Sequence, residues 1–339
     1  MAKTLGVPRF SLGSFSEAPA VFDPERLKQV IAELAREVKP LAVDPRLADL
    51  RYTLELVDGT LLRALPKMAQ SFVRHNNVGG PYHAWRLHAH LVVGAPAPRL
   101  IERTSGHDGR NKGSEIAHLR RNLEPDRCYV TDRRFYDVDL FNAINAAGSS
   151  YVCRVREDAV FEAIGEQTLW AEAREANVTR DAWVRVGQRD GADHPVRLVV
   201  VRTEPHPKRT GDGVGQSAGQ LLILTNLVDV PAEIIALIYR YRWSIELFFR
   251  FLKHLLGLRH LLSQRPAGID IQVYCCVIAC LLIYLQTGRK PDKGMMDMLG
   301  FYLLGWASEQ EVIDYLNKPD NTGVKRRAKD ELWKKMGVN

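Results

Sequence analysis

The chain has 339 residues, of which 46% are hydrophobic and 26% are charged. These proportions are those of a soluble globular protein with one large domain or two ordinary ones. Lysine and arginine number 47 against 40 aspartate and glutamate, a net charge of +7. This excess suits a polyanionic partner, but it is too small to identify one.

The cysteines and the apolar segments narrow the class of protein further. Five cysteines are an odd number, and none of them has paired metal-ligand spacing. They predict reduced, buried thiols in a cytosolic protein and argue against a zinc site. Residues 1–10 lack an apolar core, so we expect no signal peptide. The longest apolar stretch, 273–285, has about 13 residues against the roughly 20 that cross a bilayer, so we expect a buried helix and no membrane partner.

Residues 1–50 are predicted to form an arm followed by one helix. The first 20 residues are rich in Gly, Pro and Ser and suggest an extended arm. Asp23 is suited to cap a helix whose apolar face continues to about Arg36. We find no helix-turn-helix pattern in this segment.

Strands predominate in residues 51–157, which we expect to form the first part of an α/β domain. Apolar and polar residues alternate along 52–58, a pattern typical of a strand with one buried face. Further strands are expected at 84–93, 99–103, 128–132 and 151–155. A short helix or loop is expected at 66–71, and helices are expected at 113–121 and 139–147.

A second β-rich segment and a group of helices complete the chain. Residues 158–228 are rich in strand patterns and are predicted to be an inserted subdomain. Residues 229–290 return to the first domain, and residues 291–339 form a basic helical tail. The expected helices are 231–256, 271–287 and 325–335. This order predicts an α/β fold in which a mixed sheet has flanking helices and an inserted β segment.

The long helix carries the most informative pattern in the chain. At about 100° per residue, four polar side chains fall within roughly a 60° arc of one face: Tyr239, Arg242, Glu246 and Lys253. A carboxylate placed between cations can hold a divalent metal against a scissile phosphate, while the cations contact neighbouring phosphates. The same pattern is also compatible with an ordinary amphipathic helix that carries an Arg–Glu pair four residues apart.

The spacing of these four residues resembles the signature of the insertion sequence 4 family of transposases at every position. The resemblance runs from about Leu54 to Leu285. It implies a ribonuclease H-like sheet and two further catalytic aspartates on adjacent strands upstream of Glu246.

Asp58 and Asp132 resemble these two aspartates, since each lies at the end of an expected strand. Arg133 follows Asp132 as in the family, whereas Arg134 stands where the family usually has glycine, which leaves room for impaired activity. Each aspartate alone is also compatible with a turn, a helix cap or a salt bridge. Together with the helix pattern they favour a catalytic triad of Asp58, Asp132 and Glu246.

The resemblance also implies a chemistry and a set of partners. The triad would bind two ions of Mg²⁺ or Mn²⁺, with Asp58 bridging both. The substrates would be transposon terminal repeats and a target DNA, which a homodimer would cut and join in a synaptic complex. Such a protein is expected in the bacterial cytoplasm at the nucleoid. Contacts with DNA are expected from Tyr239, Arg242, Trp243, Lys253 and Arg133.

Two other interpretations stay open. The protein could be a domesticated, non-catalytic DNA-binding descendant of a transposase, or another ribonuclease H-like nuclease. The complete triad argues against the first, but the short segment before residue 50 favours it, because recognition of transposon ends often uses a larger N-terminal domain. Trp243 is also compatible with packing. His88, expected near Asp58, is compatible with a supporting role or with a structural hydrogen bond.

Overall fold

The computed structural model describes most of the chain, in the ranges 11–63, 72–76, 80–104, 115–156, 158–187, 191–203, 219–254, 261–263, 265–288 and 293–317. The chain divides into two compact units. One is Pro40–Asp270, and the other joins Met1–Lys39 to Ile271–Asn339. The N-terminal helices thus belong with the C-terminal ones, and the five-segment division expected from the sequence stays a prediction.

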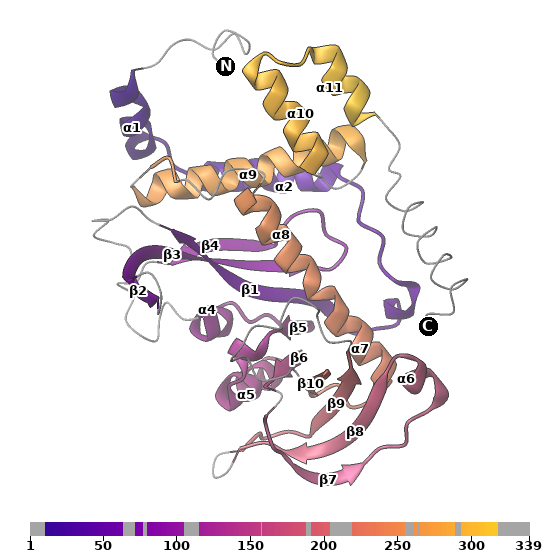
Figure 1. Ribbon diagram of the computed structural model, residues 1–339. Helices are drawn as coiled ribbons and strands as arrows, with labels where there is room; N and C mark the ends of the chain where they lie inside the picture. Colours follow the sequence, from indigo (N-terminus) through magenta and orange to yellow (C-terminus); the bar gives the residue numbers. More distant parts are fainter. Residues whose placement is uncertain are drawn as a thin grey trace. The chain divides into compact units, whose positions relative to one another are not determined.

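Ten strands of the described chain form one mixed sheet in the larger unit. Nine of them follow the order β2-β3-β1-β5-β6-β10-β9-β8-β7, and β4 pairs with β3 (Figure 1). The strands are β1 (Thr53–Arg63), β2 (Phe72–Asn76), β3 (Gly80–Val92), β4 (Leu100–Thr104), β5 (Arg127–Thr131), β6 (Ser150–Val155), β7 (Glu162–Glu166), β8 (Val178–Arg185), β9 (Val196–Arg202) and β10 (Gln220–Thr225).

The centre of this sheet has ribonuclease H-like topology. Strand β3 runs antiparallel to both β1 and β4. On the other side of β1, strands β5 and β6 follow in parallel. The predicted fold class is therefore confirmed, although β1 continues to Arg63, past the end expected at Asp58.

Helices pack against the two faces of the sheet. On one face, Leu119 of α4 and Phe141 of α5 belong to the same core cluster as Val57 and Tyr129 of the central strands. On the other, α7 and α8 contact β6 and β1 respectively. The helices of the larger unit are η1 (Pro45–Leu47), α4 (Glu115–Arg121), η2 (Arg133–Phe135), α5 (Val138–Ala146), α6 (Ala171–Glu175), α7 (Ala232–Tyr241) and α8 (Trp243–His254).

The β-rich segment after β6 extends the central sheet. Strand β10 pairs antiparallel with β6, and β9, β8 and β7 follow as antiparallel neighbours. Ala182 and Leu198 of these strands share one buried cluster with Tyr151 of β6. A buried ion pair between Arg197 and Asp181 links β9 to β8, with Nε 2.7 Å from Oδ1. The predicted insertion is present, and it shares its core with the sheet that it extends.

The smaller unit is helical, and the prediction of an extended arm at its N-terminus was wrong. Its helices are α1 (Leu12–Val21), α2 (Glu25–Glu37), α10 (Lys293–Leu304), α11 (Glu309–Leu316) and most of α9 (Pro266–Thr287). The expected N-terminal arm contains α1, because Ser11 caps this segment by accepting a hydrogen bond from the Ser14 amide. The apolar helix α9 has 22 residues, and its most apolar stretch of 18 residues has a mean hydropathy of 2.1 and is 44% buried. Its length therefore does not by itself exclude a membrane span.

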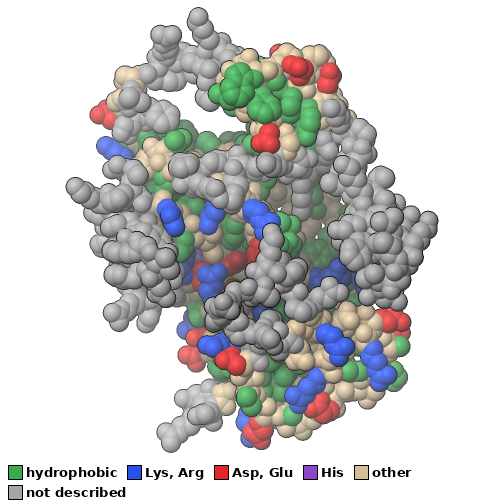
Figure 2. All heavy atoms as spheres, in the orientation of Figure 1, with side chains coloured by type: hydrophobic (Ala, Val, Ile, Leu, Met, Phe, Trp, Pro, Cys, Tyr) green, Lys and Arg blue, Asp and Glu red, His purple; other side chains and the backbone are tan. Residues whose placement is uncertain are grey.

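Some apolar side chains of this unit are exposed. Phe301, Leu304 and Trp306, on α10 and the turn after it, are 42%, 58% and 75% exposed, and hydrophobic atoms cover this part of the molecule in Figure 2. All five cysteines are free, but Cys275 is exposed, contrary to its predicted burial. The predicted elements at 66–71 and 325–335 lie outside the described residues.

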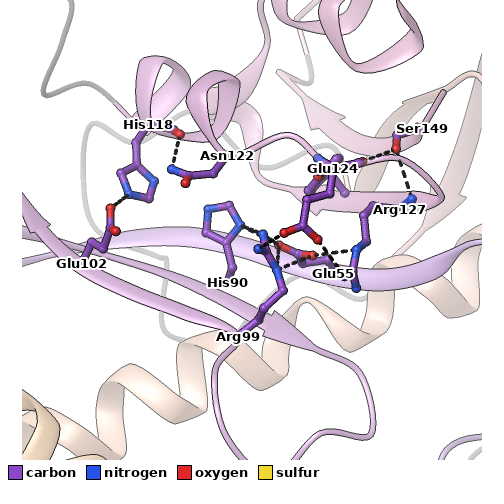
Figure 3. Close-up of polar contacts among 10 residues, drawn as sticks. Glu55, His90, Arg99, Glu102, His118, Asn122, Glu124, Arg127 and Ser149 are labelled. Carbon is purple, nitrogen blue, oxygen red and sulfur yellow. Dashed lines mark hydrogen bonds and ion pairs between the residues drawn. The ribbon is translucent and has the colours of Figure 1, made fainter. Parts of the chain in front are cut away.

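A buried polar network lies beneath β1, on the face covered by α4 (Figure 3). Glu55, fully buried, accepts hydrogen bonds from Arg99 and lies 2.6 Å from Nδ1 of His90. The ring of His118 from α4 stacks on His88 with centroids 4.0 Å apart. Burial would raise the pKa of Glu55, but the hydrogen bonds from His90 and Arg99 outweigh it and lower the pKa. The network thus holds an ionised glutamate inside the protein.

His88 is held neutral by this packing. Burial, with the nearby charges of His118 and Arg86, lowers its pKa to about 2. In the unfolded chain a histidine has a pKa of about 6.5 and takes up a proton below that value. Unfolding therefore binds protons in this range, so the free energy of unfolding decreases as the pH falls below about 6.5.

We expect His88→Gln to flatten this pH dependence. One neutral buried histidine makes the protein about 1.4 kcal/mol less stable at pH 5.5 than at pH 7.5. Urea denaturation of wild type and His88→Gln at both pH values would measure the difference. The variant should be less stable at pH 7.5, because it loses the stacking on His118, but it should lose less stability on acidification. An equal loss in both proteins would show that His88 takes up its proton in the folded state.

Candidate active site

The pairing register brings Asp58 and Asp132 to the same level of the sheet. Strands β1 and β5 are parallel with a constant offset of 74 positions, from Thr53 opposite Arg127 to Leu56 opposite Val130. Continuing this offset places Asp58 level with Asp132, one residue after the end of β5. Paired positions in a parallel sheet point to the same face, so the two carboxylates are neighbours on one side of it.

The third acidic residue lies on the helix that covers this face. Asp58 and Thr60 point to the same side of β1, because side chains alternate along a strand. Lys253 of α8 donates a hydrogen bond from Nζ to Thr60 Oγ1, which fixes α8 over this side (Figure 1). Glu246 lies on the same helix, two turns before Lys253. The three residues predicted to be catalytic are thus on facing elements.

Glu246 is directed to an arginine rather than to the two aspartates. Arg242 donates from an Nη atom to Glu246 Oε1 at 2.7 Å. The Arg242 side chain is 12% exposed, and its charge also interacts with that of Asp58. Among the described residues, no three acidic, histidine or cysteine side chains come close enough together to bind one metal ion. Joint binding by the triad therefore requires a change in the Glu246 side chain.

The electrostatics of the aspartate pair suit a divalent cation. Asp58 is 6% exposed, and burial together with the charge of Asp132 raises its pKa to about 6. An ionised carboxylate in this position is costly without a counter-charge. Oxygen donors in close pairs are the ligands that Mg²⁺ and Mn²⁺ prefer, so the two aspartates fit the ions that the sequence predicts.

Arg134 supplies positive charge to this site. Its Nε is 3.3 Å from Asp132 Oδ2, one Nη is 4.0 Å from Asp58 Oδ1, and the other is 3.3 Å from Glu115 Oε1. Burial would lower the pKa of Arg134, but the charges of Glu115, Asp132 and Asp58 outweigh it and raise the pKa. Arg134 therefore joins three carboxylates that would otherwise repel one another.

Glu115, which the sequence did not reveal, is a fourth acidic residue beside the site. It is buried at the start of α4 and forms ion pairs with Arg86 and Arg134. A Cβ atom at Gly59 would lie 2.6 Å from Glu115 Oε1. The sequence signal for this contact is the glycine after Asp58: it leaves the space that the Glu115 carboxylate occupies.

The expected DNA-binding residues differ in their exposure. The long helix is interrupted at Arg242, where hydrogen bonds three residues apart tighten the turn between α7 and α8. The prediction that one continuous helix carries all four residues on a single face is therefore wrong at Arg242. Tyr239 is 6% exposed beneath the Arg242 guanidinium, so its ring is not available for stacking on DNA. Trp243 is 51% exposed, with the Arg250 guanidinium 5.5 Å from its ring centroid.

Basic side chains also line a hollow next to Asp132. Arg133, Arg134 and Arg156 border a volume of about 390 Å³. Arg156 is paired with Asp158 at 2.9 Å. Lys and Arg side chains gather near the middle of the face shown in Figure 2 as well.

The prediction that His88 lies near Asp58 was wrong. His88 is opposite Gly59 and His90 opposite Val57 in the antiparallel pairing of β1 and β3. Both histidines therefore lie on the face of the sheet opposite to Asp58, in the network with α4. Alternation along β3 does not determine which residues of β1 share a face with the histidines.

A ribonuclease H-like sheet with paired aspartates at adjacent strands defines a site of the kind used for metal-assisted phosphoryl transfer. The family model described as "Transposase DDE domain" matches residues 51–282, and the chain belongs to this family.

Individual relatives agree with this membership. A Sinorhizobium fredii protein named as a transposase is 26% identical over 256 residues, which are 74% of this chain and 65% of that protein. A Synechocystis protein named as an insertion-sequence transposase is 25% identical over 62% of this chain and 55% of its own length. This chain thus spans less than two thirds of each. The cryo-EM structure of a piggyBac transposase synaptic complex with hairpin DNA superposes with a TM-score of 0.43 and 11% identity, over 81% of this chain and 56% of that one.

We expect Asp58→Asn to stabilise the protein when EDTA removes metal ions. The amide still accepts the hydrogen bond from the Gly59 amide that Asp58 Oδ1 accepts at 2.7 Å, but it carries no buried charge. The raised pKa of Asp58 indicates a gain of about 1–3 kcal/mol at pH 7.5. Guanidinium denaturation would measure it, with Asp158→Asn at an exposed, paired position as the control without a gain. A destabilised Asp58→Asn would show that the carboxylate is compensated without metal.

Proposed function

We propose that this protein cuts DNA at the ends of a transposon and joins those ends to target DNA, using Asp58, Asp132 and Glu246 with divalent metal ions. The observation that carries the proposal is the register of β1 and β5, which places two carboxylates side by side beneath the helix of the third. Membership of the DDE transposase family supports the same chemistry.

Each carboxylate has a distinct part in the proposed reaction. Two ions of Mg²⁺ or Mn²⁺ would activate the attacking oxygen and stabilise the leaving one during in-line displacement at phosphorus. Asp58 would bind both ions, while Asp132 and Glu246 would each bind one. Glu246 first has to leave Arg242, which then has its guanidinium available for a phosphate of the same strand.

The side chains around the triad suit a DNA backbone. Arg242, Lys253 and Arg133 would contact phosphates, and the exposed ring of Trp243 would stack on a base or sugar. Tyr239 would contact a phosphate only through its hydroxyl group, because its ring is buried. Pairing of two transposon ends would need at least a homodimer. We further propose that the protein acts on the nucleoid in the bacterial cytoplasm, without a membrane partner.

Cleavage of DNA that carries the ends of the element tests this proposal. We expect wild type to cut at the element boundary with Mg²⁺ and not with EDTA. Glu246→Gln, which keeps the shape of the side chain but removes a charge and a metal ligand, should lose activity by about a thousandfold or more. Glu233→Gln, on α7 and outside the triad, is the matched control and should retain activity.

The outcomes separate the proposed enzyme from its alternatives. Wild type that binds the ends but does not cut them would indicate a domesticated DNA-binding protein. Metal-dependent cleavage without preference for the ends would indicate another ribonuclease H-like nuclease. Full activity of folded Glu246→Gln would remove Glu246 from the reaction.

The contact of Lys253 with DNA is testable through its salt dependence. We expect Lys253→Gln to weaken binding of the element ends and to reduce the slope of log K against log salt concentration by about one, because one phosphate contact is lost. Fluorescence anisotropy over a range of NaCl concentrations would measure the slope. Lys28→Gln, in the other unit, removes the same charge and should leave the slope unchanged. Equal slopes for wild type and Lys253→Gln would place Lys253 outside the interface.

A further inference from the structure

Arg134 contacts the same carboxylates that the proposed metal ions require. Asp58 Oδ1 and Asp132 Oδ2 lie 4.0 Å and 3.3 Å from its guanidinium nitrogens. The guanidinium offsets the charge of both carboxylates and donates a hydrogen bond to Asp132. A cation bound by both aspartates would balance the same two negative charges, so it and the guanidinium compete.

Glu115 holds the guanidinium from the opposite side. It is 7% exposed and contacts Arg134 at 3.3 Å and Arg86 at 3.2 Å. Since Gly59 has no side chain, the Glu115 carboxylate can approach β1 next to Asp58. Arg134 is therefore anchored at one nitrogen by a buried acid that does not belong to the triad, while its other nitrogens face the triad.

Arg134 is also able to leave the aspartates. Its side chain is 53% exposed, and it borders the hollow that Arg133 and Arg156 line. The turn at Asp132 does not depend on the guanidinium, because Asp132 Oδ1 also accepts a hydrogen bond from the Arg134 main-chain amide at 2.9 Å. By contrast, the Arg242 side chain is only 12% exposed.

We propose that Arg134 is a positioning residue that competes with divalent metal for Asp58 and Asp132. Its guanidinium holds the two carboxylates together before metal binds. Metal binding displaces it toward Glu115 and the arginine-lined hollow, where it adds a third cation for a DNA phosphate. This inference rests on the proposed function, because it takes the two aspartates as metal ligands.

Binding of Mn²⁺ to the full chain without DNA tests the competition independently of activity. Electron paramagnetic resonance of the unbound ion would give the dissociation constant. We expect Arg134→Gln to bind Mn²⁺ about fivefold to tenfold more tightly than wild type, because no guanidinium has to be displaced. Arg133→Gln removes the same charge one residue away and should change the affinity by less than about twofold. Arg134→Lys, which keeps the charge but not the forked geometry, should fall between wild type and Arg134→Gln.

Two results would overturn the proposal. One is that Arg134→Gln binds Mn²⁺ no more tightly than wild type. The other is that Arg133→Gln gains as much as Arg134→Gln, since the effect would then be one of net charge alone. Failure of the metal site itself gives a different result: Asp58→Asn would then bind Mn²⁺ as tightly as wild type. Thermal unfolding in EDTA gives a second readout, because Arg134→Gln should unfold at a lower temperature than Arg133→Gln.

Discussion

The repulsion between Asp58 and Asp132 follows from the register of β1 and β5, and neither residue can relieve it by moving alone. Asp58 lies within a buried strand, and Asp132 directly follows one. Asp58 is buried from solvent, so the charge of its carboxylate has to be balanced by protein groups or by a bound cation. Arg134 directs positive charge at both aspartates and Arg242 directs it at Asp58, so two arginines converge on this small region.

On the opposite face of β1, the charge of a buried acid is balanced in a different way. Glu55 is also buried, but it is fixed by His90 and Arg99 in a network of protein groups alone (Figure 3). No side chain of that network has to be displaced by a bound metal ion. Strand β1 therefore carries two buried acids in different environments. The charge of Glu55 is balanced by protein groups, and this network stabilises the fold. The charge of Asp58 is only partly balanced, so its carboxylate remains available to bind a metal ion.

The fold was largely predictable from the sequence, because strand and helix periods depend on local patterns. The alternation before Asp58 and the short apolar run before Asp132 correspond to β1 and β5, whereas the four-residue pattern around Glu246 is divided between α7 and α8 by the turn at Arg242. The face of the histidines on β3 was not predictable, because it depends on which residue of β1 each one pairs with. Glu115 was also hidden, since its contact with Gly59 joins residues that no local pattern connects. The turn at Arg242 was not predictable either, because the spacing of polar and apolar residues is the same for a continuous helix and for one with a tightened turn.

The three acidic residues of the proposed site differ in how firmly they are held. The backbone of the sheet fixes Asp58 and Asp132, so their spacing is set when the strands pair. Glu246 lies on a helix, is about one third exposed and is bonded to Arg242 in the turn before that helix. Its side chain can change partners by rotation, without moving the sheet. A fixed pair and an adjustable third ligand allow the site to assemble around metal and DNA together, while the stable core of the sheet keeps the register on which the chemistry depends.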